Sequence, residues 1–363
     1  MQKPTVRKGR RAERICSSPT AWWRPHWRAI DYLRKGDAST SARRTQYNPK
    51  IKSPDTLFQP RKPMPRLATS DHYTLTLPEG HRFPIAKYAL IREQLLWQGI
   101  AAADDFYEPG LCAEDDVLRV HTAGYWHQVR DLSLGPAEVR RLGLPQSPQL
   151  VRRSLSSCAG TLQSALHALR DGVGLNLAGG THHAFADRGE GFCVLNDQAI
   201  AAAHLLAHGL ARQVLIVDLD VHQGDGTAAI FAHEPRVFTF SMHAGANYPL
   251  RKEKSDVDIA LELGTGDEEY LRLLKKTLPR LLDQVQPDFL FYQAGVDVLA
   301  TDKLGKLALT PAGCRQRDEV VLGLCHARRL PVAVSMGGGY SERLADIVDA
   351  HCNTFRVAFE QWP

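Results

Sequence analysis

The sequence lacks the features of membrane proteins and of disulfide-stabilised secreted proteins. No stretch of it approaches the ~18 uncharged apolar residues that a membrane-spanning helix needs. Its seven cysteines are scattered, odd in number and never in C-x-x-C spacing, unlike those of a disulfide framework or a four-cysteine zinc module. The N-terminus carries no apolar segment of the kind that begins secreted proteins. We therefore expect reduced, mostly buried thiols and a cytoplasmic location.

Charges of both signs are present, but they are unevenly distributed. Residues 1–70 contain 17 Lys and Arg against 4 Asp and Glu, and residues 71–363 contain the remaining 28 against 36. The formal net charge of +5 thus averages a basic segment and an acidic body. We do not expect the body to bind nucleic acid directly, and its acidity favours cationic substrates through long-range attraction.

The basic segment, residues 1–70, is expected to be an extension that precedes the catalytic domain at 71–363. It is rich in Arg, Pro, Ser and Thr and has no sustained hydrophobic period. Such a composition buries too little surface to offset the entropy of the chain. We predict a disordered extension, or a start codon placed too early. An Arg-rich organelle transit segment and an arm that binds nucleic acid or a partner are the alternatives.

From residue 72 onward, short β-branched runs alternate with longer amphipathic stretches. This alternation predicts a three-layer α/β domain whose parallel sheet is covered on both faces. Strands are expected at 72–77, 115–120, 173–178, 213–219, 236–242, 288–294 and 331–336. Helices are expected at 148–170, 197–211, 267–285, 310–329 and 341–359.

Reactive side chains follow five of the predicted strands, each just beyond the strand's last residue. Open parallel sheets bind ligands outside the carboxyl ends of their strands. The sequence therefore predicts that these side chains meet in one crevice. In chain order they are His182 with His183, Asp220 with His222, His243, Asp297 and Tyr340.

A divalent metal site is predicted where two of these strands end. Asp218 and Asp220 alternate with apolar residues, so both carboxylates lie on one side of the strand, with His222 next in the row. Asp297 adds a third carboxylate from another strand end. Asp220, His222 and Asp297 would leave coordination positions open, as catalytic sites do, and suit Zn²⁺, Fe²⁺ or Mn²⁺. Capping of the helix expected at 226–231 is the alternative, although a cap needs only one side chain.

Three further segments provide weaker signals. His182 and His183 follow a double glycine, and in an irregular loop both imidazoles can reach one cavity, each backed by a carboxylate. The turn at 189–193 could place backbone and an aromatic ring beside that cavity. The glycines at 337–339 would let the backbone approach a ligand closely, and the phenol of Tyr340 could donate a hydrogen bond to an oxyanion.

Together these residues resemble the zinc-dependent histone deacetylase family, which includes bacterial acetoin-utilisation-type and acetylpolyamine deacetylases. The similarity spans roughly 70–363. The amino-acid sequences of segments 141–145, 247–249 and 302–310 are most similar to the class IV branch and its bacterial relatives. The resemblance implies the arginase/deacetylase fold, a single, mostly parallel sheet flanked by helices with the active site at its carboxyl ends. The segments that carry it are GGTHHAFADRGEGFCVLND (179–197), VDLDVHQGDGT (217–227), FSMHAGANYPLRKEKSDVDIAL (240–261), AGVDVLATDKLGKLALT (294–310) and SMGGGYS (335–341).

The resemblance also implies a role for each matching residue. Metal ligands are matched by Asp220, His222 and Asp297, with Zn²⁺ as the expected ion and Fe²⁺ as the alternative. His183, with Asp225 behind it, matches the proton-transfer residue. The more electrostatic histidine is matched by His182 paired with Asp218, and the carbonyl-polarising tyrosine by Tyr340. The acyl-lysine tunnel corresponds to Gly191, Phe192, Tyr248 and Gly338. A structural K⁺ site would use backbone oxygens of Asp218, Asp220 and His222, with Ser241 and Met242.

The implied function is hydrolysis of acetyl or longer acyl groups from lysine side-chain amides by attack of a metal-bound water. Deacetylation of small amides such as acetylpolyamines and non-catalytic binding of acyl-lysine are alternatives. A Mn²⁺ ureohydrolase on the same fold would need a second set of metal ligands, which the sequence does not show. Many family members grip the substrate with an Asp at the tunnel rim, and the corresponding region, 129–148, offers Asp131 and Glu138 without a clear match. The acyl group and its carrier are therefore left open.

Overall fold

The computed structural model describes residues 64–363, which form an eight-stranded sheet between two layers of helices. The strand order is β2-β1-β3-β8-β7-β4-β5-β6, and every neighbouring pair is parallel. The predicted parallel sheet is thus confirmed. The strands are β1 (Leu67–Ala68), β2 (Phe106–Tyr107), β3 (Val173–Asn176), β4 (Val214–Asp218), β5 (Val237–Ala244), β6 (Val257–Leu261), β7 (Phe289–Gln293) and β8 (Val332–Ser335).

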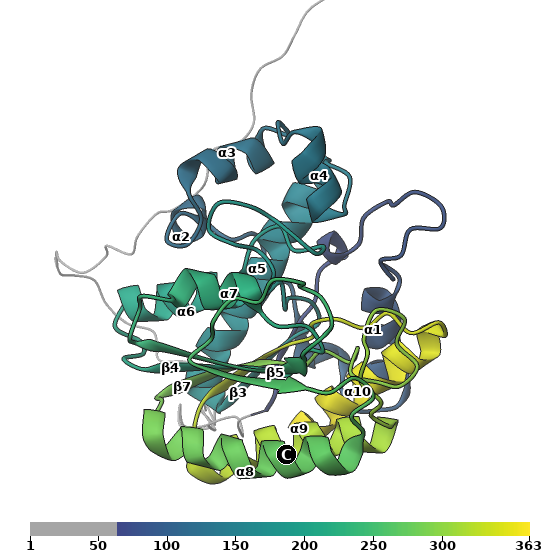
Figure 1. Cartoon of the computed structure of the whole chain (residues 1–363), viewed down its shortest axis with the longest axis vertical. Helices are drawn as coiled ribbons and strands as arrows, with labels where there is room; N and C mark the ends of the chain where they lie inside the picture. Colours follow the sequence, from purple (N-terminus) through teal and green to yellow (C-terminus); the bar gives the residue numbers. More distant parts are fainter. Residues whose placement is uncertain (1–63) are drawn as a thin grey trace, which may run out of the picture. The chain divides into compact units, whose positions relative to one another are not determined.

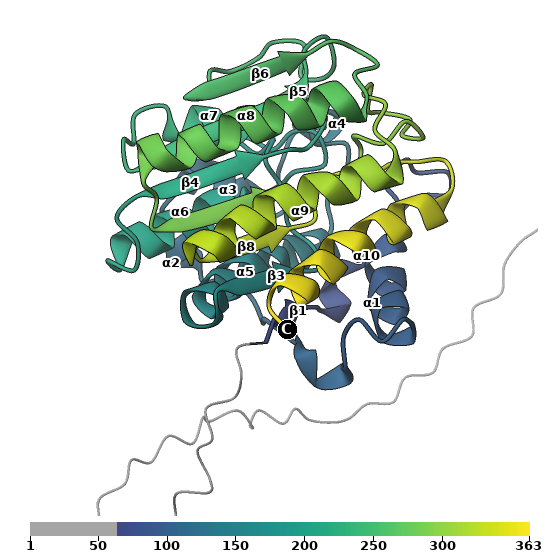
Figure 2. The ribbon, with the colours of Figure 1, turned by 90° about the horizontal axis from the view of Figure 1, so that it is seen from below.

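Helices cover both faces of the sheet. Figure 1 shows the sheet edge-on, with α5, α6 and α7 on one face and α8, α9 and α10 on the other. The view in Figure 2 shows α8, α9 and α10 side by side across the sheet. None of the helices in the described part is long and apolar enough to cross a bilayer. The α-helices are α1 (Lys87–Trp97), α2 (Glu114–Val117), α3 (Ala123–Arg130), α4 (Pro136–Leu142), α5 (Pro148–Asp171), α6 (Asp197–Ala207), α7 (Asp225–Phe231), α8 (Asp267–Val285), α9 (Pro311–Arg328) and α10 (Leu344–Gln361).

Local sequence explains where the long helices begin. The Ser147 hydroxyl accepts a hydrogen bond from the backbone N–H of Leu150 at the start of α5, and Thr310 caps α9 in the same way. Both helices have proline in the first turn, where the absent N–H costs no hydrogen bond. Three acidic residues open α8, where they interact favourably with the helix dipole.

Two predicted strands are wrong. The alternation at 72–77 reflects the burial of Tyr73 and Leu75 beside α5, but the segment pairs with no strand among residues 64–363 and overlaps a 3₁₀ turn, Asp71–Tyr73. The segment 115–120 begins inside the short helix α2, whose first turn consists of acidic residues. Alternating burial therefore does not by itself indicate a strand.

Three strands and several short helices were not predicted. β1 and β2 have two residues each and are too short to show a period. β1 lies within the segment 1–70 that was expected to be an extension, yet Leu67 and Ala68 are fully buried in the sheet. The folded domain thus begins before residue 71. The rest of the expected extension, up to residue 63, lies outside the described residues.

Sheet topology brings distant segments together at one edge. β3, β8, β7 and β4 are consecutive neighbours in the sheet although they are far apart in the chain. Because all four are parallel, the loops that follow them emerge at the same edge. His243 does not follow this pattern, since β5 extends to Ala244 and includes it.

Candidate active site

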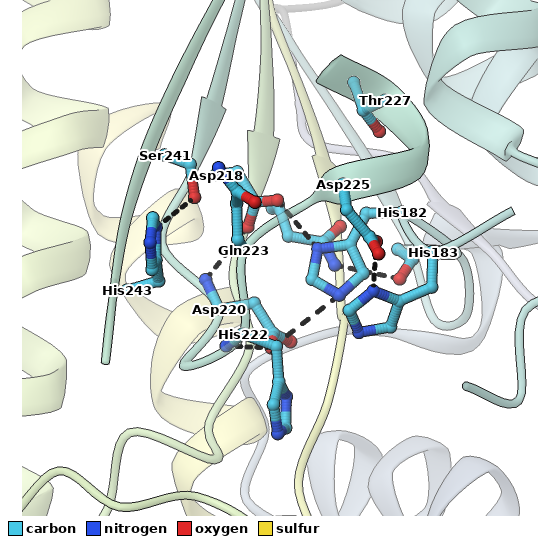
Figure 3. Close-up of polar contacts among 12 residues, drawn as sticks. His182, His183, Asp218, Asp220, His222, Gln223, Asp225, Thr227, Ser241 and His243 are labelled. Carbon is cyan, nitrogen blue, oxygen red and sulfur yellow. Dashed lines mark hydrogen bonds and ion pairs between the residues drawn. The ribbon is translucent and has the colours of Figure 1, made fainter. Parts of the chain in front are cut away.

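A cavity of about 340 Å³ lies where the loops after β3, β4, β7 and β8 meet. The close-up in Figure 3 shows the side chains that follow β3 and β4 lying close to one another. The structure therefore brings together the residues that the sequence analysis placed in one crevice, except His243. Lining the cavity are His182 and His183, Asp220 and His222, Asp297, and Tyr340.

The three predicted metal ligands converge. Each of Asp220, His222 and Asp297 offers one ligand atom, and these atoms all lie within 4.8 Å of one another. His222 Nδ1 is 3.1 Å from Asp220 Oδ1 and 3.3 Å from Asp297 Oδ2. All three residues are buried. Two carboxylates and an imidazole in this arrangement are a donor set for a divalent cation.

Hydrogen bonding around the carboxylates also fits a cation. Asp220 accepts bonds from the backbone N–H groups of His222, at 3.0 Å, and Gly338, at 2.8 Å. Asp297 Oδ1 accepts one from the N–H of Val221, at 3.0 Å. Asp297 Oδ2 is buried and has no hydrogen-bond partner within residues 64–363. A buried carboxylate oxygen without a donor is expected to face a cation.

The pKa values around the triad show a shortage of positive charge. Burial and the neighbouring carboxylate of Asp220 raise the pKa of Asp297 to about 7, although His222 opposes the shift. Burial disfavours the charged form of His222, but the adjacent carboxylates of Asp220 and Asp297 outweigh it and raise its pKa to about 10. The two carboxylates thus attract a proton to the imidazole between them. A divalent cation would compete for the same position, because ligation requires neutral histidine.

Gly338 leaves the space that Asp297 occupies. A Cβ at this position would overlap with Asp297 Oδ2 and lie 2.9 Å from Asp220 Oδ2. We expect Gly338→Ala to displace the carboxylates and to lower zinc affinity at least about 10-fold, because supporting contacts of metal ligands are typically worth that much. The control is Gly323→Ala in α9, where a Cβ meets no atom within 4 Å. Equal zinc affinity of both variants in a chelator titration would contradict this prediction.

A tight turn places the twin histidines in the cavity. Gly179 and Gly180 adopt left-handed φ values of 78° and 80°. Asp197, at the start of α6, accepts hydrogen bonds from the backbone N–H groups of Gly180, at 3.0 Å, and Thr181, at 2.7 Å. The turn is thereby fixed to α6.

Each histidine is oriented by its own carboxylate, as the sequence analysis expected. His182 Nδ1 is 2.7 Å from Asp218 Oδ2, and His183 Nδ1 is 2.6 Å from Asp225 Oδ1. The two imidazole rings lie side by side, with centroids 4.1 Å apart. Because a carboxylate engages Nδ1 of each ring, Nε2 is the nitrogen left for chemistry.

The environments of the two histidines drive their pKa values apart. Burial, reinforced by the nearby His182, lowers the pKa of His183 to about 4, although Asp225 opposes the shift. Burial also disfavours charge on His182, but the carboxylates of Asp218 and Asp220 outweigh it and raise its pKa to about 9. A neutral His183 can accept a proton, and a charged His182 can stabilise negative charge.

Tyr340 lines the cavity and contributes a phenol to it. Its backbone N–H donates to Asp302 Oδ2 at 2.6 Å. The ring packs near Phe83 and Phe192, with centroid distances of 6.4 Å and 5.9 Å. Burial, together with the carboxylates of the metal triad, raises the pKa of Tyr340 well above its ordinary value. The hydroxyl therefore keeps its proton and remains a hydrogen-bond donor.

The predicted tunnel residues line the same cavity, namely Gly191, Phe192, Tyr248 and Gly338. The Tyr248 ring lies 5.0 Å from the His183 ring, and its hydroxyl donates to Glu190 Oε1 at 2.8 Å. Phe192 has a left-handed φ of 69°, an uncommon conformation for an aromatic residue. Unusual backbone conformations of this kind often occur at functional sites.

The residues of the predicted K⁺ site lie beside the metal triad. Asp218, which precedes Asp220 and His222, ends β4 and is in register with Ser241 of β5; Met242 follows in the same strand and is buried. His243 forms a hydrogen bond with Ser241, with Oγ and Nδ1 2.9 Å apart, and it does not line the cavity. A monovalent cation at this position stays a prediction.

Arginines line the cavity in addition to the predicted residues. Arg82, Arg140 and Arg141 are exposed, whereas Arg153 is buried. The acids considered for the rim have other roles and do not line the cavity. Asp131 pairs with Arg130, and Glu138 accepts the N–H of Gly135 at the start of α4. Sequence reasoning missed these arginines because no chemical motif assigns them to the site, although Arg141 begins the segment 141–145 that contributes to the resemblance.

Comparisons with known proteins agree with this architecture. A model of the histone deacetylase domain matches residues 81–355. The chain is 46% identical over 286 residues to an uncharacterized protein of Picosynechococcus sp., covering 79% of this chain and 95% of that protein. It is 28% identical over 277 residues to histone deacetylase 2 of Arabidopsis thaliana, covering 74% of this chain and 72% of that protein.

Two solved structures share the fold. The HDA15 HD domain superposes with a TM-score of 0.70 at 22% identity, covering 82% of this chain and 89% of that one. An HDAC homolog complexed with SAHA also has a TM-score of 0.70 at 22% identity, covering 80% of this chain and 83% of that one. The expected arginase/deacetylase fold is thus confirmed. With the domain match spanning most of the described residues, the chain belongs to the histone deacetylase family of hydrolases.

Proposed function

We propose that the protein is a metal-dependent amidohydrolase that removes an acyl group from the side-chain amide of lysine. The observation that carries this proposal is the convergence of the ligand atoms of Asp220, His222 and Asp297 within 4.8 Å in the cavity that also holds His183 and Tyr340. Zn²⁺ is the proposed ion, with Fe²⁺ as the alternative, because the site offers two carboxylates and one imidazole.

The chain's own groups can perform the proton transfers of amide hydrolysis. A divalent ion bound by the triad supplies a Lewis acid that polarises the carbonyl and acidifies water. His183 accepts a proton from the attacking water at Nε2 and delivers it to the leaving amine nitrogen. Asp225 stabilises the imidazolium that forms in between. Tyr340 donates its O–H to the carbonyl oxygen as negative charge develops there, and the charged His182 adds electrostatic stabilisation.

The arginines favour an acyl-lysine substrate over an acetylpolyamine. Arg82, Arg140 and Arg141 have no carboxylate within ion-pair distance among residues 64–363. A polycationic amide would meet these like charges as it enters, despite the long-range attraction of the acidic body. A ureohydrolase would need a second set of metal ligands, whereas residues 64–363 contain a single cluster with metal-ligand spacing, so this function is disfavoured.

The proposal also includes assignment to the class IV branch and a cytoplasmic location.

Metal analysis combined with turnover tests the proposal. We expect about one zinc ion per chain and hydrolysis of a fluorogenic acetyl-lysine peptide or of its long-acyl version. Chelation should abolish turnover, and added zinc should restore it. N-acetylspermidine should be the poorer substrate. Zinc-loaded protein that binds the peptides without hydrolysing them would indicate a reader, and protein that neither binds zinc nor turns over either peptide would overturn the proposal.

A further inference from the structure

The fourth arginine of the cavity, Arg153, differs from the others because its side chain is withdrawn from solvent. Arg153 belongs to α5 and is 4% exposed. Its neighbours in the cavity wall, Phe83 and Tyr88, are also buried. We propose that Arg153 forms a carboxylate-binding subsite that selects acyl groups ending in a carboxylate, such as succinyl and glutaryl. This inference rests on the proposed function and specifies its substrate class.

The hydrogen bonds of Arg153 leave part of its guanidinium available. Nε donates to the backbone oxygen of Tyr73 at 3.0 Å, and Nη2 donates to the Tyr88 hydroxyl at 2.6 Å. No protein acceptor is found for Nη1 within the described residues, although Arg153 lines the cavity. The side chain is thus held in place by two bonds while one nitrogen can still donate to a ligand.

The charge of Arg153 also lacks a counter-ion. No carboxylate in residues 64–363 lies within ion-pair distance of it, in contrast to the fully buried Arg317, which pairs with Asp318 at 2.8 Å. The rings of Phe83 and Tyr88, 5.2 Å and 5.1 Å from its Cζ, compensate only part of the desolvation cost. A carboxylate matches the planar guanidinium in charge and in geometry.

The subsite is connected to the reacting groups through Phe83. The Arg153 guanidinium lies 5.2 Å from the Phe83 ring, whose centroid is 6.4 Å from that of Tyr340. An acyl group whose carbonyl meets the Tyr340 hydroxyl could extend along Phe83 and end at Arg153. Hydrolysis adds water across the amide C–N bond and releases the dicarboxylic acid and the lysine amine. The distal carboxylate is only bound and does not react.

Two other roles for Arg153 make different predictions. If it only fastens α5 to Tyr73 and Tyr88, its replacement lowers stability without changing acyl preference. If it binds the carboxylate that hydrolysis releases from any acyl chain, its replacement weakens inhibition by free acetate or butyrate. Acyl preference again stays unchanged.

The test compares two peptides that differ in one charge. One carries glutaryl-lysine, and the other carries its carboxamide isostere. For the zinc-loaded protein we expect kcat/KM to favour glutaryl by roughly 10- to 100-fold, the range of a hydrogen bond to a charged group. Arg153→Met should abolish this preference, so that the ratio of kcat/KM for the glutaryl peptide to kcat/KM for the carboxamide peptide falls to about one. The control variant is Arg152→Met, because Arg152 is exposed and lies next to Arg153 in α5; this variant should keep the preference for glutaryl.

A second variant and a binding measurement keep the subsite testable if Arg153→Met does not fold or if no turnover is found. Arg153→Gln, which can still donate a hydrogen bond to the Tyr73 carbonyl, replaces Arg153→Met if that variant does not fold. No glutaryl preference in the wild type, or the same preference in the Arg153 variant, overturns the subsite. Weaker inhibition of the Arg153 variant by butyrate, with an unchanged preference for glutaryl over its carboxamide, also overturns the subsite. If the wild type hydrolyses neither peptide nor acetyl-lysine, the proposed function fails. The subsite is then judged by fluorescence anisotropy, from the ratio of the two labelled peptides' dissociation constants in wild type and variant.

Discussion

Asp297→Asn is expected to lose the metal ion and, with it, hydrolytic activity. Zinc affinity should fall by at least about 100-fold, because loss of a ligand exceeds the effect of losing a supporting contact. The amide keeps an oxygen for the N–H of Val221, but it removes a negative charge and directs N–H donors to where Asp297 Oδ2 lies without a hydrogen-bond donor. Metal content by mass spectrometry and kcat/KM with an acetyl-lysine peptide should decline together.

The fold should tolerate this substitution. Asp297 is fully buried beside Asp220, and the repulsion between the two carboxylates disappears when one becomes neutral. Metal-free Asp297→Asn should therefore melt no lower than the metal-free wild type. Asp283→Asn is the matched control, because Asp283 is exposed and forms only a surface ion pair with Arg328. Unchanged zinc binding in Asp297→Asn would remove Asp297 from the ligands.

The sequence predicts an element well when the pattern of apolar and polar residues along it matches the pattern of buried and exposed side chains. The apolar runs at 213–219 and 288–294 become central strands, in which β4 and β7 are buried along their entire length. The amphipathic period at 267–285 coincides with α8, whose acidic first turn is a local feature of the sequence. β1 and β2 have too few residues for any period, and they exist because neighbouring strands offer free hydrogen-bonding edges.

The reactive core of the site was predictable for a related reason. Parallel strands place their carboxyl ends at one edge, so residues that follow separate strands can be assigned to one site before its geometry is known. Phe83 and Arg153 come instead from a loop and from the side of a helix, without a chemical motif. Arg153 reaches the cavity because α5 packs on β3 and β8, a tertiary contact that no local pattern reports. Residues that select the substrate are thus harder to predict than residues that perform the chemistry.

Tyr340→Phe is expected to separate catalysis from metal binding. We expect kcat to fall by about 100- to 1,000-fold, the usual cost of removing one donor to a developing oxyanion, with zinc content unchanged. The ring should stay in place, since its packing against Phe83 and Phe192 and the backbone bond to Asp302 do not involve the hydroxyl. KM should change little, because the lost hydrogen bond strengthens mainly in the transition state.

A tyrosine outside the cavity provides the control. Tyr107 lies in β2, and its hydroxyl is 3.3 Å from Ser164 Oγ, so Tyr107→Phe removes the same atom without touching the site. Its kcat should remain within about twofold of wild type, because the hydroxyl that is removed contacts Ser164 and not the residues of the cavity. Loss of zinc in Tyr340→Phe would show that the phenol supports the metal site. If the kcat of Tyr340→Phe equals that of Tyr107→Phe, the oxyanion is stabilised without Tyr340. The hydroxyl proton of Tyr340, which its raised pKa retains, would then have no part in the reaction.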